Sequence, residues 1–214
     1  MNVRLAGDTL LLAEYEPAVD PDVNARVVAL AAAVRRRGVA GVRDVVPGYS
    51  SVGVHFDPLR TNLGALERAL RADAKNLDRA DTFLPPRTVE IPVSYGGADG
   101  PDLDDVARFA GCTSREVIDL HSSITYRVYM LGFVPGFAYL GRVPAAIAAP
   151  RHRVPRERVA PGSVGIAGQQ TGVYPIETPG GWQIIGRTSS VMFDAAREPA
   201  SLVAPGDAVR FVPA

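Results

Sequence analysis

The segment "GSVGIAGQQTGVYPIETPGGW", which runs from Gly162 to Trp182, decides the fold of the second half of the chain. Short apolar stretches in it alternate with turns made of glycine and proline. The same pattern continues on both sides, and signs of helices almost vanish after Ile124. Many short strands with such turns are typical of a β-barrel or a β-sandwich. We expect strands at Ser163–Ala167, Val173–Ile176, Trp182–Gly186, Val191–Phe193 and Ala208–Val212.

The first part of the chain repeats one pattern twice, two strands followed by an amphipathic helix. Asp20 can cap the first helix, Pro21 suits its first position, and Gly38 follows three arginines at its end. The second helix carries its leucines on one face, at Leu63, Leu66, Leu70 and Leu77. The four strands are expected at Val3–Ala6, Thr9–Tyr15, Val42–Val46 and Ser51–Phe56. The order ββαββα predicts a small α+β sandwich in front of the barrel.

The motif "LPPR", Leu84 to Arg87, is the expected boundary, because two prolines stiffen a link. We therefore expect one domain at residues 1–84 and a second at residues 85–214. The second domain starts with a strand at Val89–Val93 and two short helices, the latter capped by Thr113 with Glu116. Helix, glycine and capped helix also outline a DNA-binding helix-turn-helix. A structural helix pair is favoured, because acidic residues on the second helix would face phosphates.

The composition excludes several classes of protein. Lysine plus arginine and aspartate plus glutamate both number 23 in 214 residues, so the net charge is zero and a dedicated nucleic-acid binder is not expected. Cys112 is the only cysteine, so neither an internal disulfide nor a cysteine-rich zinc site can form. No apolar stretch approaches 18 residues, and the first residues do not resemble a signal peptide. We expect a cytoplasmic protein that neither spans a membrane nor binds nucleic acid.

The histidines leave two interpretations open. His121 ends a short helix, where it could interact with the helix C-terminus or act as an acid or base. His152 lies in a basic loop, which could be merely solvated or could clamp an anion together with Arg151, Arg153 and Arg156. The three histidines are far apart in the sequence, so we expect no metal site. A phosphate-binding loop and a serine nucleophile elbow are both missing from the sequence.

Two stretches carry residues that could bind a ligand or a partner. In Gly162 to Trp182 the glycines could form tight barrel hairpins, or their amides could bind anionic oxygens. In "YRVYMLGFVPGFAYLGRVP", Tyr126 to Pro144, large apolar residues persist on a segment that glycine and proline should make irregular. A surface loop normally lacks such residues. The second stretch is therefore packed under something or awaits a ligand or partner.

Several long motifs resemble one family. "YRVYMLGFVPGFAYLG", "PGSVGIAGQQTGVYPIETPGGWQIIGRT" and "PGDAVRFVP" resemble the family of 5-oxoprolinase B subunits, which is also called allophanate hydrolase subunit 1 or the sporulation-kinase inhibitor family. "GDTLLLAEY" and "EIPVSYGGADGPDLDDVARFAG" resemble it too, so the likeness covers nearly the whole chain. The resemblance implies an N-terminal α+β domain and a C-terminal cyclophilin-like β-barrel.

The resemblance also implies an activity and partners. Family members work with a C subunit, which is similar to allophanate hydrolase subunit 2, as a heterodimer or heterotetramer, and with a third, A subunit. Together they open the small molecule 5-oxo-L-proline to L-glutamate with ATP and Mg²⁺. A lactam is a stable amide, and phosphorylation of its oxygen would create a leaving group.

Two alternatives stay open: a regulatory protein that inhibits a histidine kinase, and a carboxyltransferase-like part of a urea carboxylase or allophanate system. Lys75, the only lysine, lies on a predicted amphipathic helix, so the chain has no biotin attachment site.

The resemblance places the functional residues in characteristic motifs without assigning their roles. As catalytic residues we expect His121 as acid or base, Arg127 holding phosphate or carboxylate, and Gln169 orienting the substrate amide. The expected substrate- or nucleotide-binding residues are Tyr126, Gly165, Gly168, Gln170, Glu177, Trp182 and Arg187. The loop that meets the C subunit is expected to present Phe133, Phe137, Tyr139 and Leu140.

Overall fold

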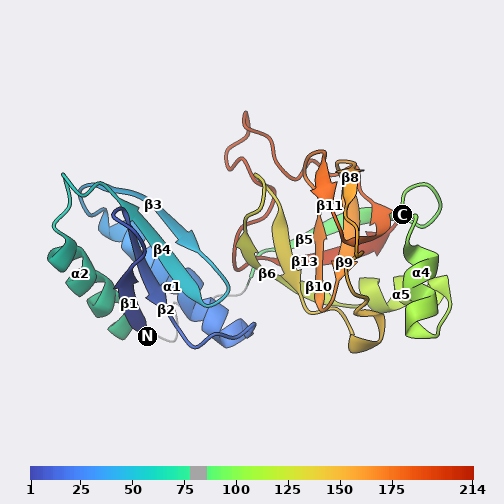
Figure 1. Ribbon diagram of the computed structural model, residues 1–214, viewed down its shortest axis with the longest axis horizontal. Coiled ribbons are helices and arrows are strands. Elements are labelled where there is room, and N and C mark those ends of the chain that lie inside the picture. The colour runs from blue at the N-terminus through green and yellow to red at the C-terminus, as the bar shows by residue number, and fades with distance from the viewer. Residues whose placement is uncertain (78–85) are drawn as a thin grey trace. The chain divides into compact units, whose positions relative to one another are not determined.

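The computed structural model describes residues 1–77 and 86–214 (Figure 1). The chain divides into two compact units, Met1–Pro85 and Pro86–Ala214, and each is described by itself. The boundary predicted at Leu84 lies outside the described residues.

The first unit is a four-stranded antiparallel sheet with two helices. The strands lie in the order β1-β2-β4-β3, and α1 packs against β3, β4 and α2. The buried side chains alternate along β2 and β4, so one face of the sheet meets the helices. The predicted order ββαββα is confirmed. The elements are β1 Asn2–Leu5, β2 Leu10–Glu14, α1 Pro21–Arg37, β3 Val42–Pro47, β4 Ser51–Phe56 and α2 Leu63–Lys75.

The first helix of this unit starts and stops where the sequence predicts, and the second ends earlier than predicted. The Asp20 carboxylate accepts hydrogen bonds from the backbone of Asp22 and Val23, both at 2.9 Å. Gly38 follows α1 with a φ of 62°, a conformation that glycine adopts without strain. The second helix ends at Lys75, so Leu77 lies beyond it, although its side chain still packs against the same core.

The second unit is a closed seven-stranded barrel in the order β10-β7-β6-β13-β5-β12-β9, with β11 and β8 paired beside it. Strand β13 runs parallel to β5 and antiparallel to β6. The mixed α+β class and the barrel are therefore confirmed. The elements are β5 Thr88–Tyr95, α4 Leu103–Ala110, α5 Ser114–Ser122, β6 Thr125–Leu131, β7 Ala138–Gly141, the 3₁₀ helix η1 Ala145–Ile147, β8 Arg156–Val159, β9 Ser163–Ala167, β10 Gln170–Val173, β11 Thr178–Gly180, β12 Gln183–Arg187 and β13 Ala208–Pro213.

Two predicted segments need correction, and a third behaves as expected. The strand expected at Val173–Ile176 is β10, which begins earlier because the chain turns back tightly after β9. The segment Val191–Phe193 forms no strand, and Phe193 contributes only an isolated bridge to Ser201. The stretch from Tyr126 begins as strand β6 and becomes irregular at residues 132–137, as its glycines and proline predict, before strand β7 follows; the non-glycine Phe133 has a φ of 68° in this turn.

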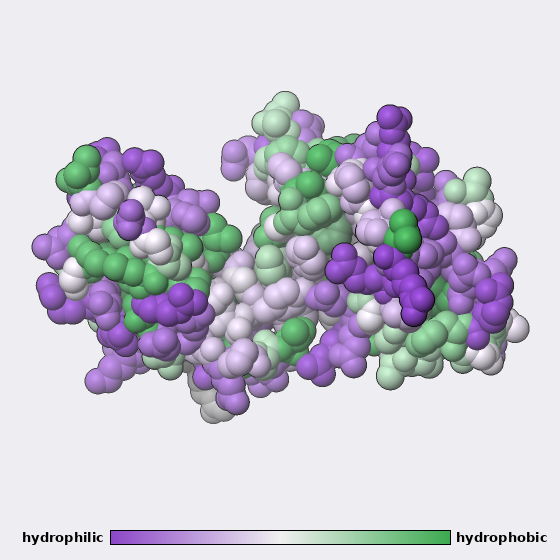
Figure 2. All heavy atoms as spheres, viewed as in Figure 1, coloured by the Kyte–Doolittle hydropathy of each residue, from purple (hydrophilic) through white to green (hydrophobic). Residues whose placement is uncertain are grey.

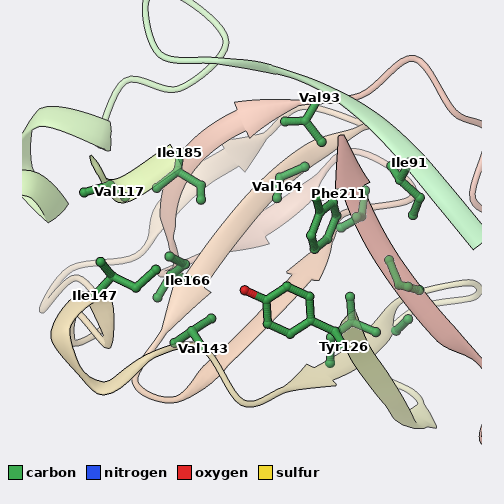
Figure 3. Close-up of a cluster of buried hydrophobic side chains, with 14 of the residues drawn as sticks. Ile91, Val93, Val117, Tyr126, Val143, Ile147, Val164, Ile166, Ile185 and Phe211 are labelled. Carbon is green, nitrogen blue, oxygen red and sulfur yellow. The ribbon is translucent and has the colours of Figure 1, made fainter. Parts of the chain in front are cut away.

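A single hydrophobic cluster fills the barrel, and Figure 3 shows Tyr126 and Phe211 within it. The two short helices contribute Val106 and Val117 to this cluster, each fully buried. The Thr113 hydroxyl accepts from the Glu116 backbone at 3.2 Å, and the Glu116 carboxylate accepts from the Thr113 backbone at 2.7 Å. The capping box is thus confirmed, and the helix pair is part of the barrel core. Within the described ranges, no helix combines the length and hydrophobicity that a membrane span requires.

Candidate functional site

A pocket of about 350 Å³ lies on the barrel unit. Its walls come from stretches far apart in the sequence: the β6–β7 hairpin, the segment before β8, the β9–β10 hairpin with the residue after it, and the turn that joins β11 to β12. The lining residues are Phe133, Phe137, Tyr139, Arg151, Pro155, Ala167, Gln170, Tyr174, Pro179, Gly180, Gly181 and Trp182.

Aromatic rings form most of this wall. The Phe137 ring lies at the centre, with ring centroids at 4.9 Å from Tyr139, 5.3 Å from Tyr174 and 5.4 Å from Trp182. All three contacts are edge-to-face, the arrangement that aromatic pairs prefer. Together with Val159 and Ile184 these residues form a cluster separate from the barrel core. The wall of the pocket is therefore a packed aromatic cluster and not a set of loosely arranged loops.

Arg151 supplies the only charge among the described lining residues. Burial raises the pKa of the Tyr139 and Tyr174 hydroxyls, and the nearby Arg151 charge opposes that shift in both. In the part of the chain that the structure describes, Arg151 forms no ion pair. The pocket is therefore apolar with one positive charge at its wall. Such a pocket favours an anionic ligand.

A buried carboxylate holds the wall that carries Arg151. Asp102 is 3% exposed and precedes α4. Its carboxylate accepts from Arg156 Nη2 at 2.5 Å and from the backbone of Ile184 at 2.6 Å, and it lies 3.3 Å from His152 Nε2. A buried carboxylate needs such partners to offset its lost hydration. Asp102 thus ties the segment after Arg151 to strand β12.

Further hydrogen bonds join the same two segments. The backbone of His152 donates to the carbonyl of Gly181 at 2.7 Å, and the Gln183 side chain donates to the carbonyl of Pro150 at 2.9 Å. Arg156 Nη1 reaches the carbonyl of Trp182 at 3.5 Å. The loop that carries Arg151 is therefore fixed against the wall that carries Trp182.

His121, the expected acid or base, lies elsewhere, fully buried inside the barrel. Its Nδ1 lies 2.8 Å from the Tyr95 hydroxyl and its Nε2 lies 2.9 Å from the Thr171 hydroxyl. Thr171 donates its own hydrogen to the carbonyl of Gly165 at 2.9 Å, so it accepts from His121, and Nε2 carries the proton. Burial lowers the pKa of His121 to about 3. The ring is neutral near pH 7 and does not reach the pocket.

Tyr126, expected at the binding site, belongs to the same interior. It is fully buried, and its hydroxyl donates to the backbone carbonyl of His121 at 2.9 Å. Burial raises the pKa of this hydroxyl above its usual range. The Phe211 ring stacks on His121 with centroids 4.7 Å apart. Neither His121 nor Tyr126 lines the pocket. Figure 3 shows Tyr126 within the barrel core, and the His121 ring packs against Tyr126 and Phe211.

Of the other expected site residues, some line the pocket and the rest lie outside it. Gln170 and Trp182 line the pocket, as expected of binding residues. Gln169 and Gly168 form the exposed turn of the β9–β10 hairpin, and Gly165 lies inside β9. The last group lies outside the lining: Arg127 is on β6, Glu177 pairs with Arg158 at 3.9 Å, and Arg187 donates to the carbonyl of Pro161 at 3.0 Å.

The residues expected at a partner interface also differ from one another. Phe133 is 59% exposed at the hairpin turn, and Tyr139 is half-buried. Phe137 and Leu140 are 2% and 1% exposed, so their side chains offer almost no surface to a partner, although Phe137 lines the pocket. Phe137 packs in the aromatic cluster and Leu140 packs in the barrel core. Phe133 is therefore the residue of this group whose large apolar side chain is exposed and able to contact a partner.

Three residues of the site were missed or misplaced by the sequence analysis. Arg151 appeared only as one member of a basic loop, and Tyr174 and Asp102 did not appear. Asp102 had no signal, because its partners come from β12 and from the segment around the start of β8. Tyr174 had no signal either, because its close approach to Gly180, where a side chain would collide with the Tyr174 ring, exists only in the folded chain. Among the residues that the structure describes, no group of three metal-binding side chains comes together.

Comparisons with known proteins agree with the fold. Residues 1–203 match the family model described as "Carboxyltransferase domain, subdomain C and D". The B subunit of 5-oxoprolinase from Escherichia coli O157:H7 is 45% identical over 212 residues, which cover 98% of this chain and 94% of the relative. The protein of the same name from Bacillus subtilis (strain 168) is 40% identical over 215 residues, with coverages of 96% and 90%.

Longer proteins contain a similar region. The solved structure of TTHA0988 has a TM-score of 0.86 and 39% identity, and the match covers 100% of this chain and 40% of that chain. A "Urea amidolyase" from Saccharomyces cerevisiae (strain ATCC 204508 / S288c) is 25% identical over 242 residues, which cover 98% of this chain and 13% of the relative. The fold of this chain therefore also occurs as one part of larger chains.

Proposed function

The chain belongs to the family of 5-oxoprolinase B subunits, and from this premise we propose that it is one subunit of an ATP-dependent enzyme that opens 5-oxo-L-proline to L-glutamate. The observation that supports this proposal is the identity of 45% and 40% over nearly the full length of two relatives with that name. Such an assembly would use ATP and an amino-acid derivative, so the cytoplasm is its proposed location.

The aromatic pocket does not fit the Mg²⁺ complex of ATP. Its described lining has one cation and no carboxylate, whereas Mg²⁺ in nucleotide sites is held through carboxylates. Its volume of about 350 Å³ suits a small molecule. We therefore propose that the nucleotide binds elsewhere in the assembly and that this chain contributes a site for the small substrate.

The chain is proposed to act with the C and A subunits of the enzyme. The turn of the β6–β7 hairpin lies beside the segment after β12, where Gly136 lies against Phe193, and Figure 1 shows the yellow turn next to the brown-red segment. Phe133 and Val191, at 59% and 60% exposed, give this region apolar surface. Figure 2 shows that hydrophobic residues also reach the surface of the barrel unit among polar ones. We place the partner contact at this turn instead of at Phe137 and Leu140.

The test is reconstitution. The chain is purified alone and together with its C and A partners, and ATP cleavage and glutamate formation are measured with 5-oxo-L-proline. The complete assembly should form glutamate only when 5-oxo-L-proline and ATP are both present, and the single chain should form none. An intact assembly that leaves 5-oxo-L-proline unchanged would exclude the proposed activity.

A second candidate is a carboxyltransferase-like part of a urea carboxylase or allophanate system. It is favoured by the description of the matching family and by the likeness to the yeast protein named urea amidolyase. Urea-dependent ATP cleavage with a biotin-bearing partner, in place of 5-oxo-L-proline turnover, would select this candidate. Inhibition of a histidine kinase is tested by none of these observations and stays a hypothesis.

A further inference from the structure

We propose that the aromatic pocket binds a small molecule with a single carboxylate, and that Arg151 is the counter-ion of that carboxylate. The inference rests on the proposed function to the extent that 5-oxo-L-proline would be the physiological ligand. The class of ligand, however, is argued from the pocket alone.

The charge of the lining selects a monoanion. Arg151 is the one ionised side chain among the described lining residues. A tyrosine is neutral near pH 7 at its ordinary pKa of about 10, and burial raises the pKa of both tyrosine hydroxyls further. A guanidinium can grip a carboxylate through two parallel hydrogen bonds, and the apolar surroundings strengthen that pairing. A ligand with several negative charges would leave all but one of them without a partner.

The size and the lining of the pocket favour a small ring. Its volume of about 350 Å³ is at the lower end for ligand sites. The rings of Phe133, Phe137, Tyr139 and Trp182 give apolar contact, and the Gln170 side chain offers an amide that can hydrogen-bond to a lactam. A ring of five atoms with one carboxylate and one amide uses each of these features.

Glycines make this arrangement possible. A side chain at Gly172 would lie 2.8 Å from the carbonyl of Ala138 and 3.2 Å from the Trp182 ring. One at Gly180 would collide with the Tyr174 hydroxyl. Glycine is therefore required where the aromatic cluster approaches the backbone, which accounts for part of the unusual glycine pattern between Gly162 and Trp182.

The pocket is organised before a ligand arrives. Asp102 accepts a hydrogen bond from Arg156, and the backbone N–H of His152 donates to the carbonyl of Gly181. These two hydrogen bonds fix the loop that carries Arg151. The cost of ordering this loop is therefore met on folding rather than on binding. This favours useful affinity even for a ligand of few atoms.

The test uses the fluorescence of Trp182, which is the only tryptophan in the chain and lies in the pocket wall. Three ligands are titrated: 5-oxo-L-proline, cyclopentanecarboxylate, which lacks the amide, and 2-pyrrolidinone, which lacks the carboxylate. We expect 5-oxo-L-proline to bind best, cyclopentanecarboxylate to bind more weakly, and 2-pyrrolidinone to bind at least tenfold more weakly than 5-oxo-L-proline.

Two variants distinguish the effect of the positive charge in the pocket wall from the effect of a positive charge elsewhere on the surface. Arg151→Gln should weaken both carboxylates at least tenfold and leave 2-pyrrolidinone unchanged. Arg153→Gln removes an exposed arginine two residues away that does not line the pocket, and it should change none of the three affinities. Thermal melts of both variants should match the wild type, which separates loss of binding from loss of folding.

The titrations are repeated by calorimetry on the assembled complex, so that a site completed by a partner is also detected. The inference is overturned if no carboxylate binds in either preparation, or if Arg151→Gln binds them as the wild type does. If cyclopentanecarboxylate binds through Arg151 and 5-oxo-L-proline does not, the ligand class stands and the proposed function fails. If the complex forms glutamate equally well with Arg151→Gln, the function stands and the site is wrong.

Discussion

The interior of the barrel and the aromatic pocket are built from similar residues, yet one is sealed and the other is open. In the interior His121 stacks on Phe211, with Tyr95 and Thr171 on its two ring nitrogens. In the pocket Phe137 is surrounded by aromatic rings beside Arg151. The interior satisfies its polar atoms internally, as structural networks do. The pocket leaves a cation facing open space.

The difference shows that residue type alone does not identify a functional site. A histidine next to a tyrosine suggested an acid or base, but its neighbours satisfy both ring nitrogens and exclude water. For the basic loop, the sequence left both a solvated surface and an anion clamp open, and the folded loop is held so that Arg151 lines a pocket. The surroundings of each polar group decide its role.

The largest effect is expected where the pocket wall is also part of the core. Phe137→Asp removes a ring that is 2% exposed and places a charge among four aromatic neighbours. It should cost at least about 4 kcal/mol of the free energy of unfolding, from lost packing and from an unpaired buried charge. Phe133→Asp at the exposed turn is the matched control and should cost little. Equal melting temperatures for the two variants, followed by Trp182 fluorescence, would contradict the burial of Phe137.

The next effect concerns the carboxylate that links the two pocket walls. Asp102→Asn should lower the free energy of unfolding by about 2 kcal/mol or more, because Arg156 loses its charged partner. The same change should weaken ligand binding roughly tenfold. Asp105→Asn on the following helix breaks the exposed ion pair with Arg108 and should change neither quantity appreciably. Chemical denaturation and titration of both variants check this. An Asp102→Asn protein with unchanged affinity would show that the pocket does not depend on this link.

The sealed interior predicts a dependence of stability on pH. Burial depresses the pKa of His121 to about 3, whereas an unfolded histidine titrates near 6.5. Between these values the unfolded state binds a proton that the folded state refuses, so stability falls as the pH falls. His121 alone should lower the free energy of unfolding by roughly 1.4 kcal/mol for each pH unit in this range. His121→Gln, which can still donate and accept, should lose this part of the pH dependence when unfolding is followed between pH 7 and pH 4.5. Parallel curves for the two proteins would mean that His121 is not sealed.

The smallest effect on stability is expected at the exposed turn. Phe133 has a φ of 68°, which is unfavourable for any residue with a side chain. Phe133→Gly should therefore leave stability unchanged or raise it by up to about 1 kcal/mol, while assembly with the partner subunits weakens. Phe133→Ala keeps the strain and removes the ring, so it should weaken assembly without the gain in stability. Normal co-purification of both variants would remove Phe133 from the proposed interface.

Much of the fold was accessible from the sequence, because it depends on local signals. Asp20 and Gly38 bound the first helix, Thr113 with Glu116 caps a helix of the second unit, and the strand expected at Ser163–Ala167 is observed with those limits. The break between β6 and β7 follows the glycines and proline at residues 132–136, whereas the neighbours that these strands pair with across the barrel could not be read from their own residues.

The site was accessible only in part. Gln170 and Trp182 were found because their motif is distinctive, and both line the pocket. His121 was misplaced because a sequence does not reveal that Tyr95 and Thr171 enclose it from other strands. Asp102 was missed for the same reason, since it meets Arg156 only after the chain has folded. A local sequence pattern carries no information about contacts between residues that lie far apart in the chain.

The central claim is that function resides in the open pocket and not in the sealed interior. The most direct measurement is glutamate formation from 5-oxo-L-proline by the assembled complex carrying either Arg151→Gln or His121→Gln, compared at a temperature where both variants are folded. We predict that Arg151→Gln lowers kcat/KM at least tenfold with an unchanged melting temperature, and that His121→Gln keeps kcat/KM within about twofold despite its lower stability. Full activity of Arg151→Gln together with an inactive, folded His121→Gln would contradict the account.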